Sequence, residues 1–282
     1  MITGSRHEAT DRYAVMGHPV GHSRSPWIHA AFGRQYGIAI SYEALDVPPE
    51  MFEAEVSAFL AAGGKGFNCT IPLKEAAFRR ADVLTERALR AGAVNTMQSL
   101  ADGALLGDNT DGHGLRADLE INLGISLEQA RILILGAGGA ARGIVAPLLE
   151  RGPAALHIAN RTAARALDLA RVFDDLGPVT GGGMDAMDGE YDLILNATAA
   201  SLSQALPPLG DGLLSREGVC YDLAYAATPT PFVIWGKEQG ARISCDGLGM
   251  LVEQAALAFE LWFRVLPTTQ PVIEALRLSL AR

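Results

Sequence analysis

Residues 131–143 constrain the fold more than any other stretch of the chain. They begin with a short, continuous apolar run, Ile132–Leu135, which is typical of a strand buried on both faces of a parallel sheet. Three glycines follow at once, Gly136, Gly138 and Gly139, and the alanine-rich segment after them predicts a helix. Glycines allow a phosphate to approach the backbone closely, and a helix N-terminus presents free N–H groups with partial positive charge.

A second strand is predicted at Ala155–Ala159, so the order is strand, glycine-rich turn, helix, strand. This order favours a dinucleotide site over an ordinary tight turn. NAD would require an acidic residue after the second strand, but Asn160, Arg161 and Thr162 stand there, with Arg165 one turn later. Because the guanidinium of Arg161 matches a 2′-phosphate, we predict NADP. A helix N-cap at Thr162 beside a solvated arginine is the simpler interpretation, and both can hold together.

The composition is that of a soluble globular protein large enough for two domains, with 282 residues, 49% hydrophobic and 20% charged. A net charge of −9 without a basic block gives no support for binding to nucleic acid or an anionic membrane. The cysteines, Cys69, Cys220 and Cys245, lack metal-type spacing and are odd in number, which favours a reduced, cytoplasmic protein without a metal site. We find no signal core near the N-terminus and no apolar run of membrane-spanning length.

The N-terminal part alternates between predicted strands and helices, which indicates a parallel α/β sheet. The strands are expected at Tyr13–Met16, Ala39–Leu45, Gly66–Thr70 and Ala93–Met97, and the helices from Ser25 to about Gly37, over Pro48–Ala62 and after Pro72. In the first helix, Ser25 is expected as the N-cap and Pro26 as the first helical residue.

A Gly/Asp/Asn-rich crossing at Leu105–Gly114 and a helix to about Leu123 lead into the dinucleotide unit. Further strands are predicted at Asp192–Leu195 and Val219–Asp222, followed by helices at Asp246–Leu266 and Pro271–Leu280. We expect these last helices to return to the first domain. The predicted organisation is a substrate domain of residues 1–110 and 247–282 and a cofactor domain of residues 111–246, with the ligand between them.

Lys74 and Asp111 are the first candidates for chemistry. Lys74 lies just inside a predicted helix start, where the helix dipole disfavours an ammonium group and suits the amine to acid–base work. An ordinary surface lysine is the alternative. Asp111 lies in a turn between the domains, where its carboxylate could orient the lysine.

Ser23 and Ser25 place two hydroxyls beside a helix N-terminus, an arrangement suited to a carboxylate, although Ser25 is also explained as an N-cap alone. Three histidines, His18, His22 and His29, have no cysteine or carboxylate cluster near them, so we interpret them as loop and helix-face residues and not as metal ligands.

Together these motifs resemble the shikimate dehydrogenase family. They occur in the order of that family and cover nearly the whole chain: His22–Pro26, Asn68–Lys74, Ala93–Thr96, Gly107–Gly114, Gly136–Gly143, Asn160–Thr162 and Asp246–Met250. The resemblance implies an α/β protein with an N-terminal substrate domain, a Rossmann-type NADP domain and C-terminal helices that return to the first domain. It also implies the reversible, NADP-dependent reduction of 3-dehydroshikimate to shikimate in aromatic amino-acid biosynthesis, by a monomer or a homodimer.

The resemblance also assigns roles to individual residues. Lys74 becomes the proton donor and acceptor, with Asp111 beside it. The substrate carboxylate and hydroxyls are expected on Ser23, Ser25, Thr70, Asn95, Tyr225 and Gln254. The cofactor is expected on Gly136, Ala137, Gly138, Gly139, Ala140, Asn160, Arg161, Thr162, Arg165, Thr198, Leu223, Gly247 and Met250. This agrees with the chemistry, because a carbonyl that accepts hydride develops negative charge on oxygen and needs a positioned acid.

Three positions depart from the usual residues of the family. Ala199 replaces a serine near the cofactor, Cys69 replaces a valine, and His18 stands where asparagine is common. We expect these changes to affect cofactor affinity and substrate fit, and not the reaction class. Two alternatives remain from the residues alone. One is a paralogue that acts on quinate or a related cyclohexane carboxylate with relaxed cofactor use. The other is an idle NADP-binding sensor, against which the presence of both Lys74 and Asp111 argues.

Overall fold

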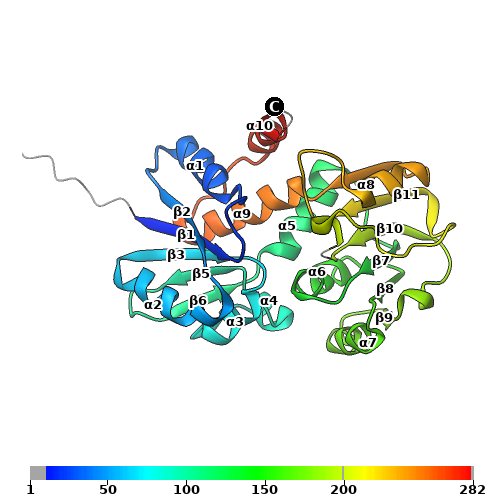
Figure 1. Cartoon of the computed structure of the whole chain (residues 1–282), viewed down its shortest axis with the longest axis horizontal. Coiled ribbons are helices and arrows are strands. Elements are labelled where there is room, and N and C mark those ends of the chain that lie inside the picture. The colour runs from blue at the N-terminus through cyan, green and yellow to red at the C-terminus, as the bar shows by residue number, and fades with distance from the viewer. Residues whose placement is uncertain (1–10, 199, 281–282) are drawn as a thin grey trace, which may run out of the picture.

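The computed structural model describes residues 11–198 and 200–280, so Ala199, one of the three departures, lies outside the described part of the chain. The strands form two separate sheets of six strands each (Figure 1). Two helices, α5 (Asp111–Ala117) and α9 (Leu248–Phe263), lie between the sheets. They pack so closely that a Cβ on Gly114 of α5 would come within 2.6 Å of the backbone nitrogen of Gln254 on α9.

The first sheet is mixed, in the order β2-β1-β3-β5-β6-β4. Its strands are β1 (Arg12–Gly17), β2 (Ser41–Asp46), β3 (Gly64–Cys69), β4 (Val83–Leu84), β5 (Thr96–Ser99) and β6 (Leu105–Asp108). The predicted all-parallel arrangement is wrong here, because β5 runs antiparallel to both β3 and β6. Residues 100–104 join β5 to β6, and a link of this length allows a hairpin but no parallel crossover.

Helices cover both faces of the first sheet. On one face, α2 (Phe52–Ala61), α3 (Lys74–Arg80) and α4 (Glu86–Ala91) contribute to a core with Phe52, Phe67 and Met97. On the other, α1 (Ser25–Tyr36) packs with α9 and α10 (Gln270–Leu280) around Phe32 and Phe259. The C-terminal helices therefore return to the first half of the molecule, as predicted.

The second sheet is parallel throughout and contains β7 (Arg131–Leu135), β8 (Ala155–Ala159), β9 (Val179–Gly182), β10 (Tyr191–Asn196), β11 (Leu214–Asp222) and β12 (Ile243–Asp246). Its order is β12-β11-β10-β7-β8-β9. Numbered along the chain from β7, this is the 3-2-1-4-5-6 order of dinucleotide-binding sheets. The strand order reverses between β7 and β10, and ligands of such sheets bind beyond the carboxyl ends of the strands at this point.

The apolar run that predicted β7 is buried as expected, with Ile132–Leu135 at 0% exposure. One face of the second sheet packs on α6 (Gly139–Leu149) and α7 (Ala163–Val172), and the other packs on α8 (Pro231–Glu238) through Phe232 and Trp235. The short strands β4, β9 and β12 and the helices α4 and α8 were not predicted. Among the described residues, no helix has the length and apolar character needed to cross a bilayer.

Candidate active site

The glycine-rich turn joins β7 to α6 at the point where the strand order reverses. Gly136 has φ of +106°, and a Cβ there would lie 3.0 Å from the carbonyl oxygen of Ala197, which follows β10. No atom lies within 4 Å of where a Cβ would stand on Gly138 or Gly139, so this backbone is open to a ligand. The first turn of α6 contains no acidic residue. The loop therefore fits a pyrophosphate group at a helix N-terminus.

The residues after β8 fit the second phosphate of NADP. Arg161 and Arg165 are exposed, and neither forms an ion pair with another described residue. Thr162 occupies the N-cap position of α7, as the simpler interpretation predicted, but its side chain makes no capping hydrogen bond. The amide of Asn160 donates to the carbonyl of Thr162 at 3.0 Å and holds this turn. The two guanidinium groups are thus free for an anion.

The nicotinamide end of the predicted cofactor site lies beyond β10 and β11. The hydroxyl of Thr198 donates to Oδ1 of Asn196 at 2.7 Å, and the backbone N–H of Leu223 donates to the carbonyl of Asn196 at 2.9 Å. The backbone of Leu223 also lies against Gly247, where a Cβ would come within 2.4 Å of its carbonyl oxygen. Met250, in the first turn of α9, is 8% exposed and belongs to the core of the second half.

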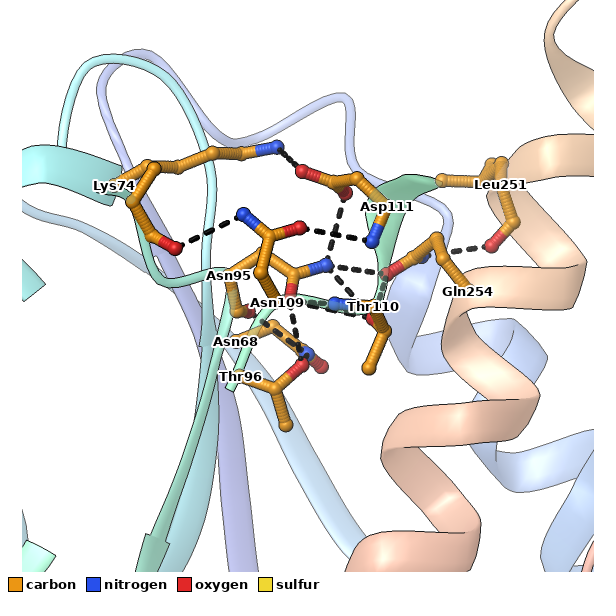
Figure 2. A network of polar contacts seen from close by, with 10 residues as sticks. Asn68, Lys74, Asn95, Thr96, Asn109, Thr110, Asp111, Leu251 and Gln254 are labelled. Atoms are coloured by element: carbon orange, nitrogen blue, oxygen red, sulfur yellow. Dashed lines mark hydrogen bonds and ion pairs between the residues drawn. The ribbon is translucent and has the colours of Figure 1, made fainter. Parts of the chain in front are cut away.

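Lys74 and Asp111 meet directly, although they stand 37 positions apart in the sequence. Each is the first residue of its helix, α3 and α5. The ammonium of Lys74 lies 2.5 Å from Oδ2 of Asp111, and their side chains are 16% and 7% exposed. Figure 2 shows the lysine reaching across to the carboxylate from the opposite side of the site. The predicted pair is therefore present as a mostly buried ion pair.

Asn95 connects this ion pair to α9 (Figure 2). Its Nδ2 lies 2.9 Å from Oδ1 of Asp111, 2.8 Å from the hydroxyl of Thr110 and 3.2 Å from Oε1 of Gln254. Its Oδ1 accepts the backbone N–H of Thr110 at 2.9 Å. Both oxygens of Asp111 are thus engaged, one by the lysine and one by the asparagine. The side chain of Asp111 has a fixed orientation as a result.

The segment Ser23–Ser25, called the serine loop below, approaches the same cluster through Tyr42 and Asn68. Neither of these two residues was assigned a role in the site from the sequence. The hydroxyl of Ser23 lies 3.2 Å from that of Ser25. Burial raises the pKa of Tyr42, and the nearby hydroxyl of Ser25 opposes that shift. Tyr42 in turn donates to Oδ1 of Asn68 at 2.7 Å. The amide of Asn68 donates to the backbone carbonyl of Asn95 at 3.1 Å. The loop and the ion pair are therefore linked by a continuous set of contacts.

The predicted N-cap role of Ser25 is wrong. Arg24 occupies the N-cap position of α1, and Ser25 is already the first helical residue, 7% exposed. Arg24 adopts a helical backbone conformation and makes no side-chain cap bond, so the helix begins one residue earlier than its serine suggests. The hydroxyl of Ser23 instead accepts the backbone N–H of Ser25 at 3.3 Å.

The other predicted substrate residues surround this cluster. Thr70 follows β3, and its backbone N–H donates to the carbonyl of Met16 at 2.9 Å. Gln254 reaches the cluster from α9 and donates to the carbonyl of Leu251 at 2.8 Å. Tyr225 comes from the second half but packs against the core of α1 and α9. Burial raises its pKa, and the nearby backbone N–H of Arg24 opposes that shift.

His29 lies beneath the serine loop, fully buried and stacked on Tyr42 with ring centroids 4.4 Å apart. Burial lowers its pKa to about 3, so the ring is neutral at physiological pH. Tyr42 and His29 are residues that sequence reasoning missed as parts of the site. Neither lies in a recognisable motif, and only the packing of α1 against β2 brings them together.

Two departures from the family pattern lie near this region. Cys69 is 2% exposed, and burial raises the pKa of its thiol, so it acts as a small apolar core residue. His18 is exposed, with Nδ1 3.2 Å from Oδ2 of Asp46. Neither side chain hydrogen-bonds to the cluster around Asn95.

The structure also has a cavity of about 500 Å³ between α4, α5 and α6, lined by residues that include Arg87, His113 and Arg142. None of the predicted site residues lines it. This cavity is therefore distinct from the group of residues around Lys74 and Asp111.

Comparison with known proteins identifies the family. Residues 15–97 match the shikimate dehydrogenase substrate binding domain, residues 119–204 match shikimate / quinate 5-dehydrogenase, and residues 247–277 match the shikimate 5′-dehydrogenase C-terminal domain. A shikimate dehydrogenase (NADP(+)) of Methylococcus capsulatus is 60% identical over 94% of this chain and 96% of its own length. One of Chromohalobacter salexigens is 56% identical over 96% and 99%.

Solved structures agree. The shikimate 5-dehydrogenase of Thermus thermophilus, in complex with NADP(H) and shikimate, is 38% identical with a TM-score of 0.84, over 95% of this chain and 99% of that one. Similarity at this level extends over both halves of the molecule. The chain belongs to the shikimate dehydrogenase family.

Proposed function

We propose that this chain catalyses the reversible, NADPH-dependent reduction of 3-dehydroshikimate to shikimate. The observation that carries the proposal is the buried Lys74–Asp111 pair, 2.5 Å apart, held by Asn95 in a protein with an open dinucleotide loop. Its relatives at 60% and 56% identity are named NADP-dependent shikimate dehydrogenases. An idle cofactor sensor has no need of a buried ion pair beside the substrate groups.

Lys74 has the role of the acid in the reduction. NADPH supplies the hydride when it is bound, and the carbonyl oxygen of the substrate then needs a proton. The ammonium of Lys74 donates that proton, and Asp111 fixes the direction of the N–H bonds and stabilises the ammonium between turnovers. In the oxidation direction the neutral amine accepts the proton from the substrate hydroxyl.

We assign the substrate carboxylate to Ser23 and Ser25, whose hydroxyls lie 3.2 Å apart. The ring hydroxyls face Asn95, Gln254 and Thr70, which offer amide and hydroxyl groups. Tyr225 closes the site from the second half of the chain. A neutral group of donors suits a small polyhydroxy acid, because the charge of its one carboxylate is shared between hydroxyls and a helix start.

We assign the pyrophosphate of NADP to the loop of residues 136–140 and the 2′-phosphate to Arg161 and Arg165, with Asn160 and Thr162 shaping that turn. Thr198, Leu223, Gly247 and Met250 line the nicotinamide half. Support comes from the open glycines, from the two arginines without ion pairs among the described residues, and from the absence of a carboxylate in the first turn of α6.

We further infer that residues 1–110 and 247–282 act as the substrate domain and residues 111–246 as the cofactor domain. The first sheet uses strands up to Asp108 and the second uses strands from Arg131 to Asp246, which supports boundaries near these positions. We propose that the protein works in the cytoplasm on a small-molecule substrate, as a monomer or a homodimer.

Steady-state kinetics with shikimate or quinate, each paired with NADP or NAD, tests the proposal. We expect kcat/KM to be highest for shikimate with NADP. A higher value for quinate would identify a quinate-preferring paralogue, and a higher value for NAD would refute the role of Arg161 and Arg165. No turnover with any pair, while NADP still binds in a fluorescence titration, would leave the sensor interpretation.

A further inference from the structure

A second carboxylate near the proposed cofactor site has no role in the chemistry above. Asp222 is the last residue of β11 and is 0% exposed. Among the described residues, no lysine, arginine or histidine forms an ion pair with it. A buried carboxylate without a counter-ion is costly unless several donors satisfy it. The presence of a carboxylate at this buried position therefore requires an explanation.

Four donors surround this carboxylate, and they come from separate segments. Oδ1 accepts from the side-chain amide of Asn196 at 3.1 Å and from the backbone N–H of Ala224 at 3.1 Å. Oδ2 accepts from the hydroxyl of Ser201 at 2.5 Å and from that of Thr230 at 2.6 Å. Burial raises the pKa of Asp222, and these hydrogen bonds oppose the shift.

Two of the segments joined in this way follow the adjacent parallel strands β10 and β11, where Asn196 is paired with Asp222. Asn196 is the last residue of β10 and holds Thr198, a proposed cofactor residue, through its Oδ1, and Ser201 follows in the segment after this strand. Ala224 belongs to the loop that carries Leu223 toward the cofactor and Tyr225 toward the substrate. The carbonyl of Ala224 also accepts the backbone N–H of Gly247 at 3.1 Å. The carboxylate of Asp222 thus joins the end of β10 and the segment after it to the loop of residues 223–225.

Tyr225 makes this arrangement relevant to the substrate. Its ring packs against the core of α1 and α9, which belongs to the first half, and lies near the backbone of Arg24, between Ser23 and Ser25. The position of residues 223–225 therefore determines both the cofactor surface at Leu223 and the place of Tyr225 beside Arg24. A shift in this loop would move both contacts together.

We propose that Asp222 is a positioning residue that couples the segment after β10, through Asn196 and Ser201, to the proposed substrate-binding loop of residues 223–225. It touches neither ligand, and it acts by holding the two segments in one geometry. The inference rests on the proposed function for the identity of the substrate, but its effect on NADP binding does not depend on turnover.

The test is Asp222→Asn, which keeps the shape of the side chain and removes its charge. We expect the Kd of NADP, measured by fluorescence titration without substrate, and the KM of shikimate each to rise about tenfold, less than the roughly hundredfold loss that a misplacement of about 1 Å can cause. Unchanged values of both constants would overturn the inference.

Phe232→Leu is the matched control for stability. Phe232 is 0% exposed in α8, two residues beyond Thr230, and packs in the apolar core away from the hydrogen-bond network. We expect this variant to lower the midpoint of thermal unfolding without a change in the Kd of NADP or the KM of shikimate. If both variants lowered the midpoint equally and changed neither constant, Asp222 would be only a structural residue.

Ser201→Ala serves as a milder variant if Asp222→Asn does not fold. It removes one donor from the segment after β10 and leaves the bond to Ala224 in place, so the Kd of NADP should rise about threefold to tenfold while the KM of shikimate stays near wild type. An unchanged Kd would overturn the role of this network. A wild-type protein that binds NADP but shows no turnover would refute the proposed function alone, since the titration of both variants would still test the inference.

Discussion

The two halves of the active site are prepared for their ligands in opposite ways. On the substrate side, Lys74, Asp111, Asn95 and Gln254 are already bound to one another, and the ion pair is largely buried. On the cofactor side, the glycines face open space, and Arg161 and Arg165 are exposed without ion pairs to described residues. In the proposed function, the fixed geometry serves the reacting atoms, while the exposed charge serves a large anion that must bind and leave.

Two buried carboxylates, Asp108 in the first sheet and Asp222 in the second, are stabilised differently. Asp108 of β6, 1% exposed, accepts a bidentate contact from Arg87, with distances of 2.6 and 2.5 Å. Burial acts to raise the pKa of Asp108, but the hydrogen bonds and charge of Arg87 outweigh it, and this pKa is lowered. The pKa of Asp222, which has only neutral donors, is raised because burial prevails. The two groups therefore make contributions of opposite sign to the pH dependence of stability.

The largest expected effect is that of Lys74→Ala on the substrate side. Loss of a general acid–base group typically lowers the rate by about 10²–10⁴-fold, so kcat should fall on this scale while the Kd of NADP stays near wild type. Steady-state kinetics and a fluorescence titration measure the two quantities. A kcat within a factor of about three of wild type would remove Lys74 from the chemistry.

Arg161→Ala tests the open side and should have the next largest effect. Charge-assisted hydrogen bonds to a phosphate contribute roughly 1.5–3 kcal/mol, so the KM of NADP should rise about 10- to 100-fold while that of NAD changes little. Raising the salt concentration should weaken NADP binding in the wild type more than in the variant, because the exposed charge is screened. Equal loss for both cofactors would mean that Arg161 stacks or packs only.

Arg87→Ala tests the difference between the two buried carboxylates. Fully buried pairs cost about 3–5 kcal/mol when one partner is removed, and because the side chain of Arg87 is 30% exposed we expect roughly 1–2 kcal/mol at pH 7. A carboxyl with a lowered pKa stabilises the fold above its unfolded pKa of about 3.9, and that contribution disappears as pH falls through its folded pKa.

The free-energy difference between wild type and Arg87→Ala, measured by urea unfolding, should therefore shrink as pH is lowered below about 4. For Asp222 the sign reverses: a raised pKa favours the fold in acid, and this contribution is lost as pH rises through the folded pKa. Hence the free energy of unfolding of Asp222→Asn, relative to that of wild type, should be higher at pH 7 than at pH 4. Parallel pH profiles for the two variants would contradict the opposite pKa shifts of Asp108 and Asp222.

The smallest effects on stability belong to Ser23→Ala and Ser25→Ala. Because Ser25 makes no capping bond, each change should cost less than about 1 kcal/mol of unfolding free energy. Both should raise the KM of shikimate and leave the Kd of NADP unchanged. Denaturation midpoints and kinetics on the same samples check this, and a normal KM for Ser25→Ala would move the carboxylate site elsewhere.

Much of the second half could be predicted from the sequence because its signals are local. A continuous apolar run, three glycines and an alanine-rich segment lie within one short stretch, and the predicted strand at Ala155–Ala159 has the bounds that the structure shows. The first half of the molecule has weaker local sequence signals. The sequence predicts that Leu105–Asp108 is part of a polar crossing, but the structure shows it as strand β6. The hairpin of β6 with β5 makes the sheet mixed and not parallel.

The site divides in the same way. Lys74, Asp111 and Asn95 lie in recognisable motifs, and the structure brings them into contact. Tyr42 and Asp222 carried no sequence signal, because their importance depends on partners far along the chain: Tyr42 reaches Asn68, and Asp222 reaches Asn196 and Thr230. The N-cap at Ser25 failed for a local reason, since Arg24 adopts a helical backbone conformation without a side-chain cap.

The tight packing of α5 on α9 has a mechanical consequence. These helices lie between the two sheets (Figure 1). A side chain at Gly114 would have no room against Gln254. If the halves rotate about this contact, groups near the axis move least and groups far from it move most. Asp111 and Gln254 lie near this axis and would keep their separation during such a rotation. The glycine-rich loop of residues 136–140 and the loop with Ser23 and Ser25 would move apart. The carboxylate of Asp111 and the amide of Gln254 would then keep their relative geometry while the ligands enter and leave.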